Sequence, residues 1–266
     1  MKPLSAKNFP QRIFIGSMDK ERVYRIGSVI LALLLWQIIS MFVDMEMLLA
    51  SPLTVIKRLF TLIFEKDFLK TVSYSVLRIT GGFLLAFIAG CVFAVLAARF
   101  RAVELLLWPY VATVKAVPVA SFIILCLIWF SYDQLTVLIS FLIVFPVIYS
   151  NFLQGMKSTD RNMLEMAELY RIGWHKRFLY IYLPCVKPYL LSAAGIGVGM
   201  AWKSGVAAEV IGVVNSSIGE RLYNAKIYFQ NADLLAWTIV IVLCSVLGEK
   251  LFKGLIKIIF AGIEKL

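Results

Sequence analysis

Long apolar runs separated by short polar stretches dominate this sequence. A helix needs about 20 mostly apolar residues to cross the hydrocarbon core of a bilayer. Segments of that kind occupy residues 23–43, 76–98, 105–130, 135–153, 186–208 and 234–254. The fifth run is interrupted by Lys203, and the last depends on the snorkelling of lysines near its end. We therefore predict an all-α integral membrane protein with about six transmembrane helices.

The composition supports burial in lipid rather than in water. Apolar residues make up 61% of the chain and charged residues 16%, whereas soluble proteins have roughly 45–50% and about 25%. Too little polar material remains to cover a soluble core. We interpret residues 1–22 as a cytoplasmic N-terminal segment and residues 23–266 as a single transmembrane domain, in which residues 23–43 are a retained anchor.

The net charge of +11 has a topological explanation. When the N-terminus is placed in the cytoplasm, the inner segments hold far more Lys and Arg than the outer ones. This bias is typical of cytoplasmic loops and predicts that both termini are cytoplasmic. Because the basic residues flank apolar runs, we do not expect nucleic-acid binding.

Residues that could hold a metal or a cofactor are scarce. The four cysteines are widely spaced without a CxxC pair, and His175 is the only histidine, so neither a metal site nor a disulfide framework is expected. The Gly195–Gly199 repeat lies inside an apolar run and indicates close helix packing rather than a dinucleotide site. No phosphate-binding loop of the G-x-x-x-x-G-K-[ST] kind occurs. We expect no cofactor.

The connection between the fourth and fifth spans, about residues 154–185, contains a short two-faced helix. The N-cap candidates are Ser158, Thr159, Asp160 and Asn162. Asn162 with Glu165 has the spacing of a capping box, and Gly173 is a plausible helix stop. Helical spacing places Met163, Met166, Ala167 and Tyr170 on one face. Two readings follow from the residues: an interfacial or solvated connector, or a docking helix for a cytoplasmic partner.

Several segments resemble one family of transporters. Glu165–Ala167, followed by Gly173 and then Ile181–Pro184, looks like the EAA loop of bacterial ATP-binding-cassette importer permeases. Leu49–Val55 and Trp202–Gly212 are similar to segments of the nitrate, sulfonate and taurine branch. The likeness covers roughly residues 48–262. It departs from the pattern where Met166 replaces an alanine and where Arg171 replaces the usual glycine.

The resemblance implies a type I ABC importer permease in the bacterial inner membrane. Such a permease pairs with a second copy and moves a small polar or anionic solute, of the nitrate, sulfonate or taurine kind, by alternating access. An external solute-binding protein delivers the solute, and separate ATPase subunits hydrolyse ATP, so the chain itself is expected not to be an enzyme. The residues implied in ATPase coupling are Glu165, Met166, Ala167, Tyr170 and Gly173.

Charged residues and a proline within the spans are candidates for the translocation pathway. Lys203 and Glu209 lie in or near the fifth span, where charge is costly unless it faces a cavity or a partner. Both could equally sit at the outer interface. Pro118 is expected to kink the third span, as in helices that line transport routes. Lys115 is expected near the inner face.

Two other classes of function remain open at this stage. A membrane-embedded enzyme would need convergent carboxylates or histidines at membrane depth, and the spans contain no carboxylate pair. An ion channel gated by the cytoplasmic loop would conduct without an ATPase. Co-purification with a nucleotide-binding subunit would separate both classes from the permease.

Overall fold

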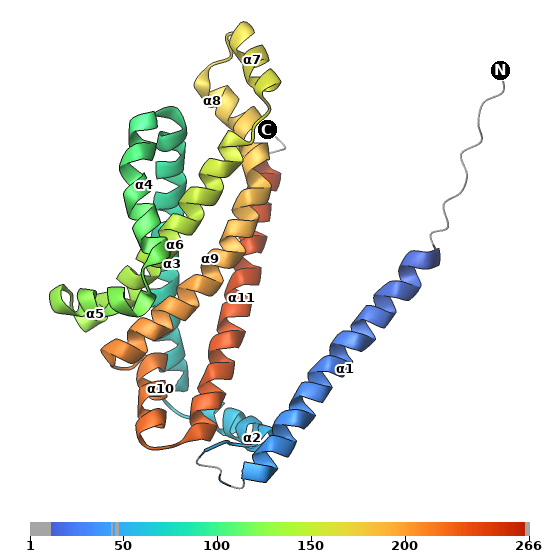
Figure 1. Cartoon of the computed structure of the whole chain (residues 1–266), viewed down its shortest axis with the longest axis vertical. Coiled ribbons are helices and arrows are strands. Elements are labelled where there is room, and N and C mark those ends of the chain that lie inside the picture. Colours follow the sequence, from blue (N-terminus) through green and yellow to red (C-terminus); the bar gives the residue numbers. More distant parts are fainter. Residues whose placement is uncertain (1–11, 44, 46–47, 264–266) are drawn as a thin grey trace.

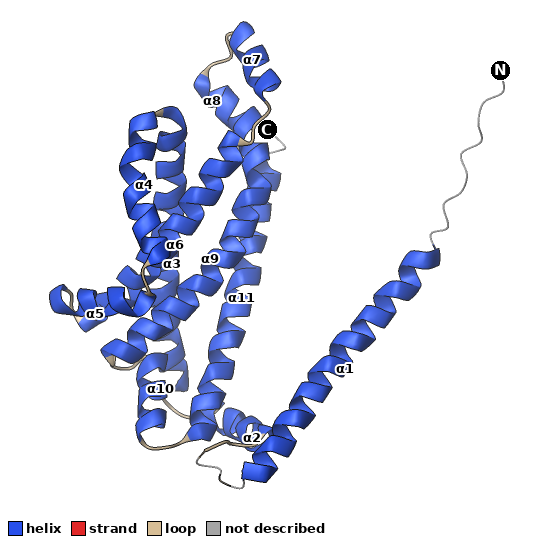
Figure 2. Cartoon of the chain, in the orientation of Figure 1, coloured by secondary structure: helices blue, strands red, loops and turns tan. Residues whose placement is uncertain are grey.

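The computed structural model describes residues 12–43, 45 and 48–263, and this part of the chain is helical without strands (Figure 2). Most of the expected N-terminal segment, residues 1–11, lies outside the described residues. The helices form an elongated bundle in which α1 stands apart, approaching the rest only near α2 (Figure 1). The all-α prediction is confirmed.

The elements follow one another without long unstructured connections. They are α1 (Arg12–Val43), α2 (Pro52–Ile63), α3 (Phe68–Arg99), α4 (Arg101–Ala116), α5 (Val119–Trp129), α6 (Tyr132–Lys157), α7 (Arg161–Leu169), α8 (Trp174–Arg177), the π-helix η1 (Phe178–Tyr182), α9 (Leu183–Gly212), α10 (Ile218–Ile227) and α11 (Asn231–Ile263). Helices α7 and α8 lie at one end of the bundle, and α2 and α10 lie at the other (Figure 1). We call these the α7 end and the α2 end.

Five helical stretches in the described residues are long and apolar enough to cross a membrane. They lie in α1, α3, α6, the continuous stretch Trp174–Gly212 and α11. A sixth exists if the bent pair α4 and α5 counts as one span. The prediction of about six spans is therefore confirmed, although α11 extends to Ile263, beyond the expected end of the sixth span.

The third predicted span, residues 105–130, is not one helix. Helices α4 and α5 meet at an angle of 110°, so α5 points sideways from the bundle (Figure 1). Val117 has extended backbone angles and Pro118 precedes the first residue of α5. Proline offers no N–H to the preceding turn and disfavours helical angles in the residue before it. The expected kink is thus a full break.

The centre of the bundle is the packing of α3 and α9 on either side of α6. Glycines occupy the closest crossings. A Cβ on Gly82 would lie 2.8 Å from Cβ of Ser140, and one on Gly90 would lie 2.9 Å from Cβ of Ile148. Small residues at such crossings let membrane helices approach closely. This tight core fixes where the ends of α3, α6 and α9 lie.

Ser51-Pro52 is typical of a helix start, with proline in the first turn, and helix α2 begins at this pair. The side chain of Ser51 accepts a hydrogen bond from the backbone N–H of Thr54 at 3.2 Å, and Pro52 occupies the first turn. Val55 and Leu62 are buried, while Phe60 is exposed. Helix α2 is therefore two-faced, and it packs its inner face on α11.

Candidate functional site

The segment between α6 and α9 forms a protrusion at the α7 end (Figure 1). Asp160 caps α7, because its side chain accepts a hydrogen bond from the backbone N–H of Asn162 at 2.9 Å. The predicted capping box of Asn162 with Glu165 is wrong. Glu165 instead pairs with Nε of Arg161 at 2.9 Å, on the exposed surface of the helix.

The predicted helix stop at Gly173 is also wrong. Helix α7 ends at Leu169, and Arg171 takes the left-handed conformation with φ of 51°. The N–H of Ile172 donates to the carbonyl oxygen of Ala167, and the N–H of Arg171 donates to that of Glu168, both at 2.9 Å. These two bonds form a Schellman motif, which usually places glycine where Arg171 stands.

Gly173 has an ordinary φ of −62° and precedes the first residue of α8. It therefore separates two helices rather than ending α7. The difference from the prediction has a simple cause: two backbone hydrogen bonds fix where α7 stops, and they require the left-handed conformation two residues before the glycine.

The two faces of α7 differ in how they are held. Ala167 is fully buried, whereas Met166 and Tyr170 are 51% and 72% exposed. The prediction that Ala167 shares the docking face with these residues is therefore wrong. From α8, the guanidinium of Arg177 donates to the carbonyl oxygens of Ile172 at 2.7 Å and Ala167 at 3.1 Å.

An exposed apolar surface remains on α7 after this packing. Its residues are Met163, Met166, Leu169 and Tyr170, all more than half exposed. We call this set the α7 face. Methionine and tyrosine side chains are adaptable contacts for a partner surface. The hydrogen bonds from Arg177 to the backbone carbonyls of Ala167 and Ile172 hold the helix in place, and they involve none of the side chains of the α7 face.

The broken span places a cavity between α4 and α6. Its volume is about 380 Å³. Lys115, near the C-terminal end of α4, donates from Nζ to Oγ of Ser150 at 2.9 Å. Lys115 lies near the break at Pro118, about four turns from the start of α4. Pro118 itself is exposed and does not line this cavity.

Glu209 is fully buried where α3, α9 and α10 meet. Its Oε2 accepts hydrogen bonds from Oγ of Ser75 at 2.8 Å and from the N–H of Gly219 at 3.2 Å. Oγ of Ser75 also accepts from the N–H of Ile218 at 2.9 Å. The other carboxylate oxygen of Glu209, Oε1, has no hydrogen-bond partner among the described residues. This position favours helix packing over contact with a passing solute.

Lys203 lies on the same helix but is exposed. It makes no hydrogen bond or ion pair with the part of the chain that the structure describes, and it does not pair with Glu209. An exposed ammonium group in a spanning helix is costly unless water or a partner reaches it.

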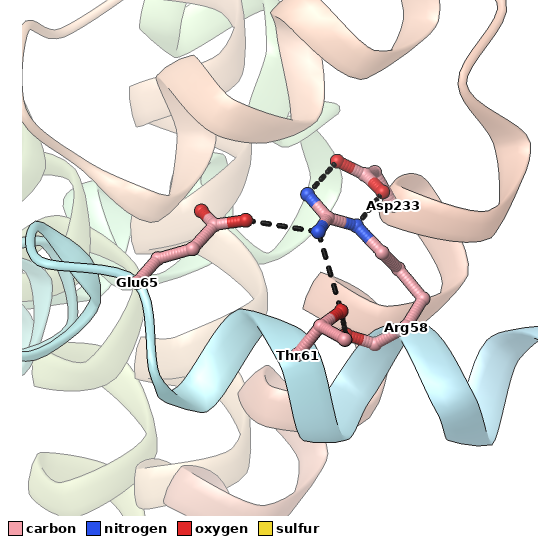
Figure 3. A network of polar contacts seen from close by, with 4 residues as sticks. All are labelled: Arg58, Thr61, Glu65 and Asp233. Atoms are coloured by element: carbon pink, nitrogen blue, oxygen red, sulfur yellow. Dashed lines mark hydrogen bonds and ion pairs between the residues drawn. The ribbon is translucent and has the colours of Figure 1, made fainter.

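A network that the sequence analysis missed joins α2 to the start of α11 (Figure 3). Arg58 contacts Asp233 through both Nε and Nη2, the latter at 2.7 Å, and its Nη1 lies 2.9 Å from Oε1 of Glu65. The hydrogen bonds to Asp233 raise the pKa of Arg58 above its usual value. Only two local features of the sequence point toward this network. Arg58 is a basic residue on a two-faced helix, and Asp233 is an acidic residue in the first turn of α11.

No group of three or more His, Cys, Asp and Glu side chains in the described residues could hold a metal ion. The exposed features are an apolar helix face and a cavity lined by more basic than acidic residues. The polar junctions at Glu209 and at Arg58 are buried or partly buried.

Comparisons with known proteins agree with this picture. Residues 82–265 match the family described as "Binding-protein-dependent transport system inner membrane component". The "Putative aliphatic sulfonates transport permease protein SsuC" of Bacillus subtilis (strain 168) is 27% identical over 222 residues, which cover 82% of this chain and 80% of that protein.

Two further likenesses widen the comparison. The "Formylaminopyrimidine transport permease protein ThiX" of Halalkalibacterium halodurans is 24% identical over 243 residues, covering 89% of this chain and 94% of that protein. A solved structure titled "Crystal structure of an amino acid ABC transporter with histidines" matches with a TM-score of 0.50 and 16% identity. It covers 74% of this chain and 99% of that one, and shows the fold alone.

Proposed function

Because the chain belongs to the family of binding-protein-dependent transport system inner membrane components, we propose that it forms the membrane pathway of an importer for small organic anions. The chain is a multi-pass permease of the ABC importer type, of the sulfonate branch. The identity of the solute, the ATPase contact and the pairing of two copies are the parts that we propose.

The α7 face is the proposed contact with the ATPase subunits. It is the exposed apolar surface of a helix outside the bundle, and its backbone is fixed by Arg177 independently of that surface. An amphipathic helix with one free apolar face suits docking into a groove of a partner protein. ATP hydrolysis then belongs to the partner, because this sequence lacks the phosphate-binding loop.

The proposed orientation places the α7 end in the cytoplasm. The last described residues of α11 lie at that end (Figure 1), and Lys250, Lys253 and Lys257 occupy its final turns. Cytoplasmic ends of membrane helices are enriched in such residues. Helix α1 (Arg12–Val43) ends at the α2 end (Figure 1), so its first residues point away from that end. The α2 end then faces the external solute-binding protein.

A sulfonate-like anion is the proposed solute. The relative from Bacillus subtilis is named for aliphatic sulfonates, and the exposed Lys203 and Lys115 place positive charge within the spans. The relative named for formylaminopyrimidine shows that sequences of this similarity also serve a different solute. A second copy of the chain is proposed to complete the pathway.

The α7 face is the observation that carries this proposal, and reconstituted uptake tests it. The chain is placed in liposomes with its cognate ATPase and solute-binding protein, and ATP-dependent uptake of labelled ethanesulfonate is measured. Glu165→Ala is expected to lower uptake at least about tenfold while the protein still inserts, because Glu165 lies beside the α7 face. Glu168→Ala is the matched control on the same helix. Uptake that persists without ATPase would instead indicate a channel.

A further inference from the structure

The cavity between α4 and α6 combines depth with positive charge. It is lined by Glu104, Trp108, Val111, Ala112, Lys115, Tyr149, Ser150, Leu153, Gln154 and Lys157. Glu104 and Lys157 lie toward the α7 end, since α4 begins there and α6 ends there (Figure 1). Lys115 marks the deep end. The cavity therefore leads from the α7 end into the bundle.

Lys115 reaches membrane depth. Helix α4 begins at Arg101 and rises 1.5 Å per residue, which places Lys115 roughly 21 Å along it. The hydrocarbon core of a bilayer is about 30 Å thick, so Lys115 lies within that core when α4 begins at its edge. A charged side chain there normally faces water or the interior of a bundle. Its Nζ donates to Oγ of Ser150 across the cavity.

The charges that line the cavity do not cancel. Glu104 is engaged by Lys157 at 2.7 Å and by Arg101 at 2.8 Å, so its negative charge is already compensated. Lys115 has no carboxylate partner among the described residues, and its contact is the neutral hydroxyl of Ser150. One positive charge is therefore left to attract an anion into the deep end.

Neutral groups complete the lining. The hydroxyl of Ser150 lies 2.9 Å from Nζ of Lys115. The hydroxyl of Tyr149 is buried beneath the wall of the cavity. Val111, Ala112 and Leu153 provide apolar wall beside these donors. A singly charged oxyanion with a short apolar tail matches this set of groups.

We propose that the cavity is an inner binding site for a short alkanesulfonate or a similar monovalent oxyanion, with Lys115 as its anchoring charge. The anion occupies this site between Lys115 and the α7 end. The hydroxyl of Ser150 binds one of its oxygens, and its tail lies on the apolar wall. This inference rests on the proposed function, because it assigns a location to the proposed solute.

The test measures how charge controls access to a cysteine placed at Ala112, an exposed residue of the cavity wall. The reassembled transporter carrying Ala112→Cys is treated with a sulfonate-bearing and with a trimethylammonium-bearing ethyl methanethiosulfonate. When Lys115→Gln is added, we expect the anionic rate to fall and the cationic rate to rise, each on the order of fivefold, as for loss of one charge at close range in water. The ratio of the two rates then falls by about the product of these factors. Ethanesulfonate should slow the anionic reagent, and choline should not.

Matched variants separate charge from structure. Lys115→Arg keeps the charge and should keep the anionic preference. Lys70→Gln removes a lysine from the exposed α2 end of α3, outside the cavity, and should leave the ratio unchanged. The chain without Ala112→Cys gives the background from Cys91, Cys126, Cys185 and Cys244.

The same samples are assayed for ATP-dependent uptake, so that the two proposals fail in different ways. The inner site is overturned if Lys115→Gln leaves the ratio of the two rates unchanged, even when uptake is normal. It is also overturned if ethanesulfonate does not slow labelling by the anionic reagent. If the anionic preference and the protection appear but no ATP-dependent uptake follows, the site stands and the importer proposal falls.

Discussion

The α7 protrusion and the α2 end of the bundle are held together by different kinds of contact. In the protrusion, which lies beyond the ion pair that joins α6 to α4, Arg177 donates to backbone carbonyls and the side chains of the α7 face stay free. At the α2 end, buried or half-buried charges connect helices directly: Glu209 joins α9 to α3 and α10, and Arg58 joins α2 to α11. One end offers a surface, and the other fixes helix positions.

This difference separates the parts that meet partners from the parts that hold the frame. A buried polar network is satisfied in only one arrangement of its helices, so it specifies their positions. An exposed face of methionine and tyrosine can adapt to a partner without disturbing such a network. We therefore expect substitutions at the α2 end to lower stability, and substitutions on the α7 face to lower coupling while stability is kept.

The largest loss of stability is expected from Glu209→Ala. It leaves the hydroxyl of Ser75 and the N–H of Gly219 without their acceptor, and each orphaned buried group costs on the order of 1–3 kcal/mol. Glu209→Gln keeps an acceptor oxygen and should retain most of the stability. Thermal unfolding in detergent, followed by size-exclusion chromatography, measures both. An alanine variant as stable as the native chain would remove Glu209 from the frame.

Gly219→Ala is expected to be the next most damaging change. The added Cβ would lie 2.5 Å from the carbonyl carbon of Glu209 and 2.6 Å from the backbone nitrogen of Val210. Backbone cannot yield as a side chain does, and overpacking of this kind costs about 1–3 kcal/mol. Gly199→Ala is the control, because nothing lies within 4 Å of its added Cβ. Equal unfolding temperatures for the two variants would contradict the close contact between α9 and α10.

A double-mutant cycle on Arg58 and Asp233 should give an intermediate effect. The pair is bidentate but partly exposed, so a coupling free energy of about 1 kcal/mol is expected. The same cycle on the exposed pair of Arg161 and Glu165 in α7 should give about 0.3–0.5 kcal/mol. Thermal unfolding of the single and double variants supplies both values. A larger coupling in α7 would reverse the contrast between the ends.

The smallest effect, and one of opposite sign, is expected for Arg171→Gly. Glycine adopts the positive φ of this position without the cost that other residues incur. The change should stabilise the end of α7 by roughly 0.5–1 kcal/mol, seen as slower hydrogen–deuterium exchange in Ala167–Ile172. Glu168→Gly lies inside the last turn of α7 and should speed exchange instead. Faster exchange in Arg171→Gly would show that the Schellman motif does not control this end.

Local features of the sequence predicted the spans, the start of α2 at Ser51 and the presence of α7. Apolar length and capping residues act over a few residues, so they can be read directly from sequence. The full break at Pro118 was predicted only as a kink. Its size depends on how α5 packs against α6 and α9, which no local pattern encodes.

Long-range pairings could not be predicted in the same way. Ser75 and Glu209 are 134 residues apart, and Arg58 and Asp233 are 175 apart, so only the folded bundle shows that they meet. The predicted end of α7 is wrong for another reason. Glycine is the usual residue at a positive φ, so the sequence favours Gly173 as the end of the helix. The hydrogen bonds accepted by the carbonyls of Ala167 and Glu168 instead place the positive φ at Arg171.

Co-purification with the cognate ATP-binding-cassette subunit tests most directly whether α7 receives the ATPase. The native chain and the control Glu168→Gln should retain the subunit in equal amounts. Met166→Asp places a charge on the α7 face, where the native side chain is 51% exposed. It should lose the subunit while its unfolding temperature stays unchanged. Retention of the ATPase subunit by Met166→Asp at the native ratio would contradict the assignment of the α7 face as the docking surface.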